Sequence, residues 1–180
     1  DEDGSDVLAT ATLQPYENLS FANKHTTKST TDPGAQPAEI IIDKDFINNS
    51  GVVLTDAEQT FSFGLYTDEA CNNPVEGSIT SGAGTNQVVC SISENGTPIV
   101  VKGKDGQDIS IKINYTDADL LTDAEKVYYL KEIAGSNSGK MSHMQYSEDV
   151  YKVTVTLGYE NSVLKADTDI RKVTSGVTGN

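Results

Sequence analysis

Two charged residues lie in apolar, strand-like stretches where they could take part in acid–base chemistry. Lys44 ends the stretch IIIDK (40–44), and Glu132 comes late in YYLKEI (128–133). Side chains alternate along a strand, so Tyr128, Leu130 and Glu132 share one face. If the two apolar residues face the core, Glu132 is carried inward, where a lone carboxylate must become protonated or find a partner. The pattern therefore predicts a buried acid at Glu132 and a lysine that ends a core strand.

Each of these positions also has a purely structural explanation. Lys44 could extend from a strand edge into solvent, and Glu132 could lie on the surface between packed neighbours. Asn23, in the short stretch FAN (21–23), could be a strand-end residue bonded to a turn. His25 and His143 lack the spacing of metal ligands, so we expect no metal and no cofactor.

The elements that must position these residues are predicted to be strands. The pattern is mostly of period two, rich in β-branched residues and tyrosine, and broken by turn sequences such as NNSG and KDGQD. A helical pattern occurs only in DADLLTDAEK (117–126). We expect an all-β fold, a two-sheet sandwich of the immunoglobulin-like kind. The predicted strands are 7–13, 17–23, 38–44, 59–66, 86–92, 97–103, 108–115, 126–133 and 150–159.

Four stretches together resemble the isopeptide-linkage domains of Gram-positive pilins and surface adhesins. This group comprises the B-type collagen-adhesin and streptococcal pilin-shaft domains. Its pattern is an apolar first strand ending in Lys, a YxLxE strand, a YxVTVT strand and a last strand of the form F-x-N. Here the stretches are IIIDK with Lys44, YYLKE with Glu132, YKVTVTLGY from Tyr151, and FAN with Asn23.

The resemblance implies an amide cross-link between Lys44 and Asn23, with Glu132 as the acid/base group. An apolar pocket favours the neutral, nucleophilic form of lysine. A protonated glutamate can polarise the Asn carbonyl and carry protons as ammonia leaves. The reaction would be a single-turnover self-modification, so we do not expect an enzyme that acts on external substrates.

The order of the stretches predicts a divided domain. Residues 1–24 form an N-terminal arm that docks through Leu19 and Phe21, and residues 25–37 form a linker rich in Thr, Pro and Gly. Residues 38–180 form a sandwich that lacks its own last strand. The arm could complete the next copy in a filament, fold back onto its own domain, or be one joint of a longer tandem array.

The two cysteines, Cys71 and Cys90, are expected to form a disulfide, with two unpaired buried thiols as the alternative. The loop between them is rich in Gly, Asn and Ser, so a covalent tether would be useful there. A disulfide would place the protein outside the reducing cytosol.

The net charge of the chain limits the classes of molecule that it could bind. The formal charge is −14, so nucleic acid and anionic membranes would meet a repulsive field. No transmembrane run or signal peptide is seen in the 180 residues, which suggests a mature, soluble chain. The leading hypothesis is a structural subunit of an extracellular bacterial filament, such as a pilus shaft, whose partners are other copies of itself. The alternative is a monomeric surface adhesin that binds a host protein or glycan through the loop between Cys71 and Cys90.

Overall fold

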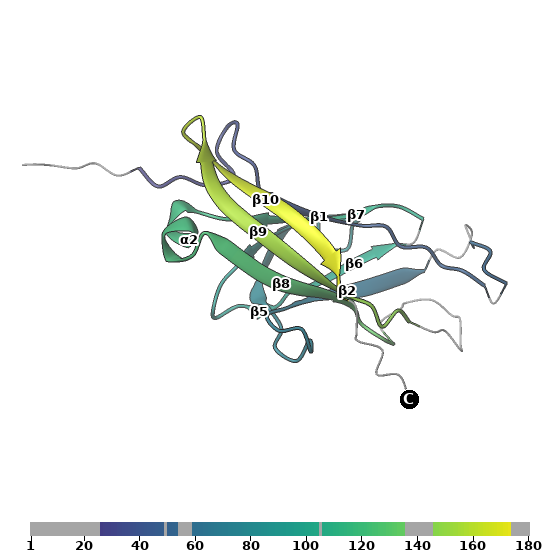
Figure 1. The fold of residues 1–180 in the computed structure, drawn as a ribbon. Coiled ribbons are helices and arrows are strands. Elements are labelled where there is room, and N and C mark those ends of the chain that lie inside the picture. The colour runs from purple at the N-terminus through teal and green to yellow at the C-terminus, as the bar shows by residue number, and fades with distance from the viewer. Residues whose placement is uncertain (1–25, 49, 54–58, 105, 136–145, 174–180) are drawn as a thin grey trace, which may run out of the picture.

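Two β-sheets packed face to face make up the domain, which is an all-β sandwich as expected (Figure 1). The computed structural model describes residues 26–48, 50–53, 59–104, 106–135 and 146–173. The first sheet has the order β1 (Ala38–Ile42), β7 (Ile109–Asn114), β4 (Gln87–Ile92), β3 (Glu76–Ser81) and β5 (Thr97–Pro98). The second has the order β10 (Val163–Lys172), β9 (Val150–Glu160), β8 (Glu125–Glu132), β2 (Thr60–Tyr66) and β6 (Val100–Lys104).

The core lies between the sheets and is built from alternate residues of most strands, while β2 buries five residues in a row. Neighbouring strands pair antiparallel, except that β4 and β7 run parallel. The short helix α2 (Asp117–Thr122) begins with a capping box between Thr116 and Asp119, which satisfies its first free amides. The largest fully buried side chains are Phe61, Ile40, Leu65, Ile99, Ile109, Ile111, Ile113, Leu164, Val88, Val101, Val153 and Val155.

Seven of the predicted strands lie in the described part of the chain, and each has an observed counterpart. The stretch 97–103 divides into β5 and β6 at Ile99, where the chain crosses between sheets. Ile99 is buried and joins both sheets: its N–H donates to the Val75 carbonyl at 2.9 Å, and its own carbonyl accepts the Leu65 N–H at 3.4 Å. Strands β3 and β10 were not predicted.

Residues 28–36, expected to belong to a linker, are hydrogen-bonded to the domain. The Lys28 carbonyl accepts the N–H of Asp117, and the Thr30 N–H donates to the carbonyl of Tyr115, both at 2.9 Å. Further along, Gln36 bonds to the backbone of Leu164 and Ala166 at the start of β10. This segment is therefore part of the domain's edge rather than a free connection.

Within the described residues, no helix has the length and apolar character needed to cross a membrane.

Two buried tyrosines predict how stability depends on pH. The Tyr115 hydroxyl donates to that of Tyr128 at 3.1 Å, and burial raises the pKa of both phenols, that of Tyr128 to about 12. Because the unfolded chain ionises near the usual value of 10, the folded state holds these protons more tightly. The stabilisation is complete below pH 10 and is lost as the pH rises to 12.

The Tyr128→Phe variant should therefore lose less stability than the parent in alkali. Between these two pH values the parent should lose about 2–3 kcal/mol more stability than the variant, since one pKa unit is worth about 1.4 kcal/mol. Denaturant unfolding across this range measures it, with Tyr159→Phe, at an exposed site, as the control. Equal slopes in parent and Tyr128→Phe would contradict the argument.

Candidate functional site

Lys44 and Glu132 meet at one end of the core. Tyr128, Leu130 and Glu132 are all buried, which confirms the predicted inward face of β8. Strand β1 belongs to the sheet opposite β8, and Lys44 lies two residues beyond the end of β1. The Lys44 Nζ is 3.3 Å from Glu132 Oε2, and the side chains are 17% and 3% exposed. The structure thus joins an amine from one sheet to a carboxylate from the other.

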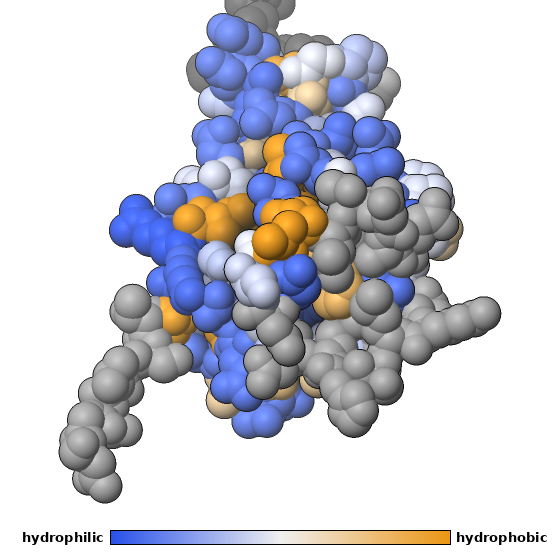
Figure 2. Space-filling view, turned by 90° about the vertical axis from the view of Figure 1, so that its right-hand side faces the viewer, coloured by the Kyte–Doolittle hydropathy of each residue, from blue (hydrophilic) through white to orange (hydrophobic). Residues whose placement is uncertain are grey.

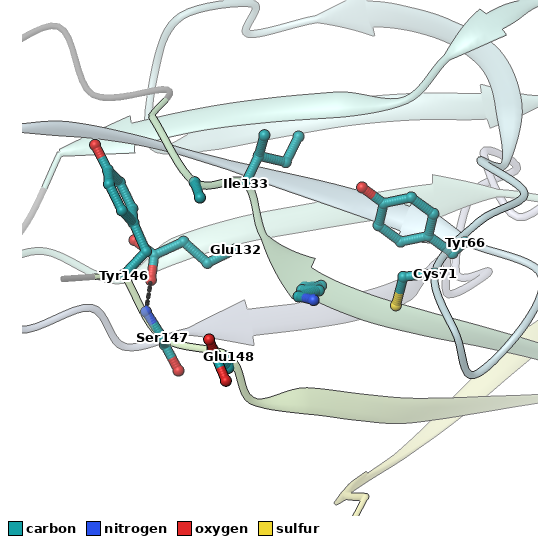
Figure 3. A pocket seen from close by; sticks show the side chains of 9 residues that line it. Tyr66, Cys71, Glu132, Ile133, Tyr146, Ser147 and Glu148 are labelled. Atoms are coloured by element: carbon teal, nitrogen blue, oxygen red, sulfur yellow. Dashed lines mark hydrogen bonds between the residues drawn. The ribbon is translucent and has the colours of Figure 1, made fainter.

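The surroundings of this pair are partly apolar. The Lys44 amine lies 4.5 Å from the centre of the Phe61 ring, a cation–π distance, and Phe46 packs on Phe61 with ring centres 6.1 Å apart. On the other side, the Ser147 N–H donates to Glu132 Oε2 at 2.9 Å (Figure 3). One oxygen of the carboxylate therefore receives two donors.

The second oxygen, Glu132 Oε1, is buried and has no hydrogen-bond partner among the described residues. A buried acceptor left unpaired costs about 1–3 kcal/mol. Other parts of the Glu132 side chain or backbone line a cavity of about 190 Å³, large compared with the roughly 30 Å³ that one water occupies in the liquid. The site thus combines a cavity with a buried, unsatisfied acceptor. The cavity is lined by Ile42, Asp43, Lys44, Asp45, Phe63, Leu130, Lys131, Glu132, Ser147, Asp149 and Tyr151.

The sandwich is incompletely filled beside this cavity. Tyr151 alternates in phase with buried Val153 and so faces inward, yet it is 37% exposed. Ile170 likewise follows the inward phase of buried Ala166 but is 38% exposed. Thr168 lies between Ala166 and Ile170 on the same face of β10. Its hydroxyl oxygen is buried and has no hydrogen-bond partner in the described part of the chain. At this end, no element among the described residues fully covers the inner faces of β9 and β10.

Two further features mark the same end. Strand β1 is the edge strand of its sheet in the described part of the chain. Strand β10 lies beside the start of this edge, where Gln36 pairs with Lys165, and within the described residues no strand pairs with β1 itself on that side. Ile47, Val52 and Val53, which follow β1, are exposed. Figure 2 shows a group of hydrophobic residues within an otherwise largely hydrophilic face at the end toward which β10 runs. Edge backbone and exposed apolar side chains together are typical of a place where another strand binds.

The arm residues proposed to fill this place, Leu19, Phe21 and Asn23, lie outside the described residues.

The expected disulfide is wrong for this structure, because Cys71 and Cys90 are both free thiols. Cys90 is fully buried in β4, where its Sγ donates to the Lys112 carbonyl at 3.4 Å. Cys71 lies on the loop that follows β2, a strand of the other sheet, and has a left-handed φ of 56°. The chain between them is not a tethered loop, since it contains β3, which pairs with β4.

A second, more open hollow of about 630 Å³ lies beside the end of β8. Tyr66 and Cys71 lie on one side of it, and Glu132, Tyr146 and Ser147 on the other (Figure 3). No group of three or more potential metal-ligating side chains occurs within the described ranges.

Sequence analysis did not identify Phe61 or Ser147 as parts of the site. Phe61 was placed correctly in a strand, but its contact with Lys44 joins distant segments and leaves no local pattern. Ser147 contributes its backbone N–H, which every residue except proline has, so its residue type carries no signal. The exposed inward faces of β9 and β10 could be recognised only once the pairing of β10 was known.

Comparison of the chain with family models, with curated proteins and with solved structures finds no match.

The free thiols should differ strongly in reactivity. Burial raises the pKa of Cys90 to about 11 and shields its sulfur, whereas Cys71 is only partly buried. We expect a thiol reagent to modify Cys71 in the native protein and Cys90 only after unfolding. Mass spectrometry without prior reduction measures this, with Cys71→Ser as the control that should remain unmodified until denatured. An unreactive parent that becomes reactive on reduction would instead indicate a disulfide.

Proposed function

We propose that this chain is a structural module of an extracellular filament. In this proposal an immunoglobulin-like sandwich is completed by a donated strand and stabilised by a Lys–Asn amide bond. One observation carries the proposal: the buried Lys44–Glu132 pair, with its unpartnered oxygen, adjoins the free edge of β1. An ion pair that served stability alone would gain nothing from an unpaired oxygen on a glutamate that also lines a cavity. A site that awaits an incoming carboxamide accounts for both.

The chemistry proposed for this site balances in three steps. Glu132 takes a proton from the Lys44 ammonium across the 3.3 Å contact, which leaves an amine beside an acid. The amine attacks Cγ of Asn23, and the acid donates its proton to the leaving nitrogen. The new C–N bond forms as the Asn23 Cγ–Nδ2 bond breaks, and the last proton leaves with ammonia as ammonium. No oxidant or other co-reactant is required.

The unfilled end of the sandwich supports a strand as the occupant. A strand beside β1 would pair with its free backbone edge and cover the exposed inner faces of Tyr151 and Ile170. The arm has suitable residues, because Leu19, Phe21 and Asn23 alternate and so share one face.

The direction of that strand follows from the position of the core. Ile40, Ile42 and Lys44 share the inward face of the β1 segment. If the arm runs parallel to β1 with Asn23 beside Lys44, then Phe21 lies beside Ile42 and Leu19 beside Ile40. In the antiparallel direction these two apolar residues would lie beyond Lys44, away from the core. The parallel direction is therefore favoured.

The charge at the mouth of the cavity is consistent with this register. Asp43, Asp45 and Asp149 line the cavity, and Asp149 already pairs with Lys172 at 2.7 Å. The residues that follow Asn23 in the arm are Lys24 and His25. In the parallel register Lys24 would lie beside Asp45, so an acidic residue of a lining that also holds Lys44 and Lys131 would meet a basic flank. Such complementarity favours the correct partner and speeds its association.

Intact mass followed by peptide mapping tests the proposed bond. We expect a branched peptide that joins Lys44 to Asn23 and is lighter than the sum of its parts by one ammonia. Denaturing gels should also show ladders that survive boiling in detergent. Unmodified Lys44 and Asn23 peptides, together with a unit monomer mass, would contradict the amide bond.

The role of Glu132 is tested by Glu132→Gln, which keeps the size of the side chain but removes the acid. We expect the fold to remain and the cross-link to be lost, because a carboxamide cannot relay protons. Glu148→Gln, at an exposed position nearby, is the matched control and should cross-link normally. A normal yield in folded Glu132→Gln would show that the assigned role is wrong.

A further inference from the structure

One face of the domain has a charge balance unlike that of the whole chain, which carries a formal charge of −14. On β6, β8, β9 and β10 the buried residues mark the inward phase, so the residues between them face outward. Those outward residues include six lysines or arginines but only four aspartates or glutamates, and β2, the fifth strand, has no charged residue. The outward face of this sheet is therefore slightly positive, while the rest of the chain is strongly acidic.

The strand register divides this face into a basic half and an acidic half. The boundary lies between two adjacent rows of paired residues, Tyr129–Lys152–Arg171 and Val127–Thr154–Asp169. On one side of it, the outward strand residues include five bases and no acid: Lys102, Lys104, Lys131, Lys152 and Arg171. On the other side they include four acids and one base: Glu125, Glu160, Asp167, Asp169 and Lys165. The charge thus changes sign along the direction of the strands.

This face is open in the part of the chain that the structure describes. In Figure 1, β8, β9 and β10 lie in front of the other sheet, and no described helix or strand covers them. Arg171 pairs with Asp169 at 2.8 Å, but the two side chains stay 80% and 57% exposed. Lys131 and Glu125 form no ion pair with any described residue. Both halves therefore present charges to a partner.

The arrangement is complementary to itself. When two copies are placed face to face, a two-fold axis can run across the strands at the boundary between the halves. Because this axis reverses the strand direction, Tyr129 of each copy lies on Val127 of the other. Two residues further along β8, Lys131 lies opposite Glu125 of the other copy. Every contact occurs twice, so an apolar centre has an ion pair on each side.

Strand β10 makes a matching contact about the same axis. Arg171 lies in the row of Tyr129, and Asp169 lies in the row of Val127. Arg171 of each copy is therefore opposite Asp169 of the other, and the pair within one copy becomes a network of four charges. Packed sheets keep their strand directions within about 30° of each other, a rotation that long Lys and Arg side chains accommodate.

We infer that the outward face of the β10–β9–β8–β2–β6 sheet binds the same face of a second copy. The inference goes beyond the proposed function and does not depend on it, because it uses neither Lys44 nor the edge of β1, which belongs to the other sheet. Negative charge elsewhere on the two copies opposes the contact, but beyond about 8 Å this repulsion is screened at physiological ionic strength. In a filament, the contact would hold neighbouring filaments side by side.

Sedimentation of the full-length chain over a range of protein and salt concentrations tests the inference. The parent should form dimers that dissociate as salt rises. Lys131→Glu and Glu125→Lys should each raise the dissociation constant about tenfold or more, because each reversal makes two attractive contacts per dimer repulsive. An equimolar mixture of the two variants should restore association as a heterodimer, since acid then meets base at both contacts. Lys102→Glu, on β6 and two strands away from β8, is the control and should dimerise like the parent.

Four results would overturn the inference. One is a parent that stays monomeric at high concentration and low salt, and another is a pair of single variants that each associate as well as the parent. The third is a mixture that does not associate although circular dichroism shows both variants to be folded. The fourth is a monomeric parent that binds the polyanion heparin through Lys131, since the basic half would then serve an anionic partner. Ladders that survive boiling report only the amide of the proposed function, so the two failures are distinguishable.

Discussion

A charged pair buried where the core is not closed is the constraint on which the rest of this domain depends. Moving a lysine and a glutamate out of water costs several kcal/mol per ion, and one contact at 3.3 Å recovers this only when the remaining donors and acceptors are satisfied. Here Ser147 and the Phe61 ring supply part of that compensation, while Glu132 Oε1 remains unpaired among the described residues. In the proposed function, a further group that paired with this oxygen would stabilise the site, and the β1 edge is the place from which a strand would bring it.

One inserted strand would resolve several local deficits at once. It would pair the free edge of β1, cover the inward faces of Tyr151 and Ile170, and bring a polar group to Glu132. Exposed strand edges are liabilities that natural proteins usually block with charges, bulges or covering loops. In β1 the outward residues are Glu39, which pairs with Lys112, and Ile41, which is 57% exposed, so a charge protects only part of the edge. A strand partner for the rest of the edge would account for the exposed Ile41.

The sequence predicted those parts of the structure that local alternation encodes. The buried face of Tyr128, Leu130 and Glu132 follows from period two, and the apolar run before Lys44 places this lysine just beyond the end of a strand. Strand β10 was missed because its sequence, VLKADTDIRK, is rich in charged residues and weak in β propensity, yet ten backbone pairs with β9 hold it. The disulfide failed because chain separation says nothing about which sheet each cysteine joins. Residues 28–36 looked like a linker by composition, but their backbone groups bond to the domain.

In the proposed assembly, the hydrogen bonds of the segment that follows the arm determine which part of each copy bears load. Tension from the next copy would enter through that copy's residues 24–28 and cross the Asn23–Lys44 amide. It would then pass back along β1 toward Lys28, whose carbonyl accepts the Asp117 N–H. The path through each copy would therefore be covalent between residues 23 and 44, and the other strands would not carry it. Within that path the turn at 31–35 is the segment that could extend. The hydrogen bonds of Thr30 to Tyr115 and of Gln36 to β10 hold it on both sides. Under force those hydrogen bonds would break first and lengthen the path, while the Lys44 site, bonded covalently, would keep the copies joined.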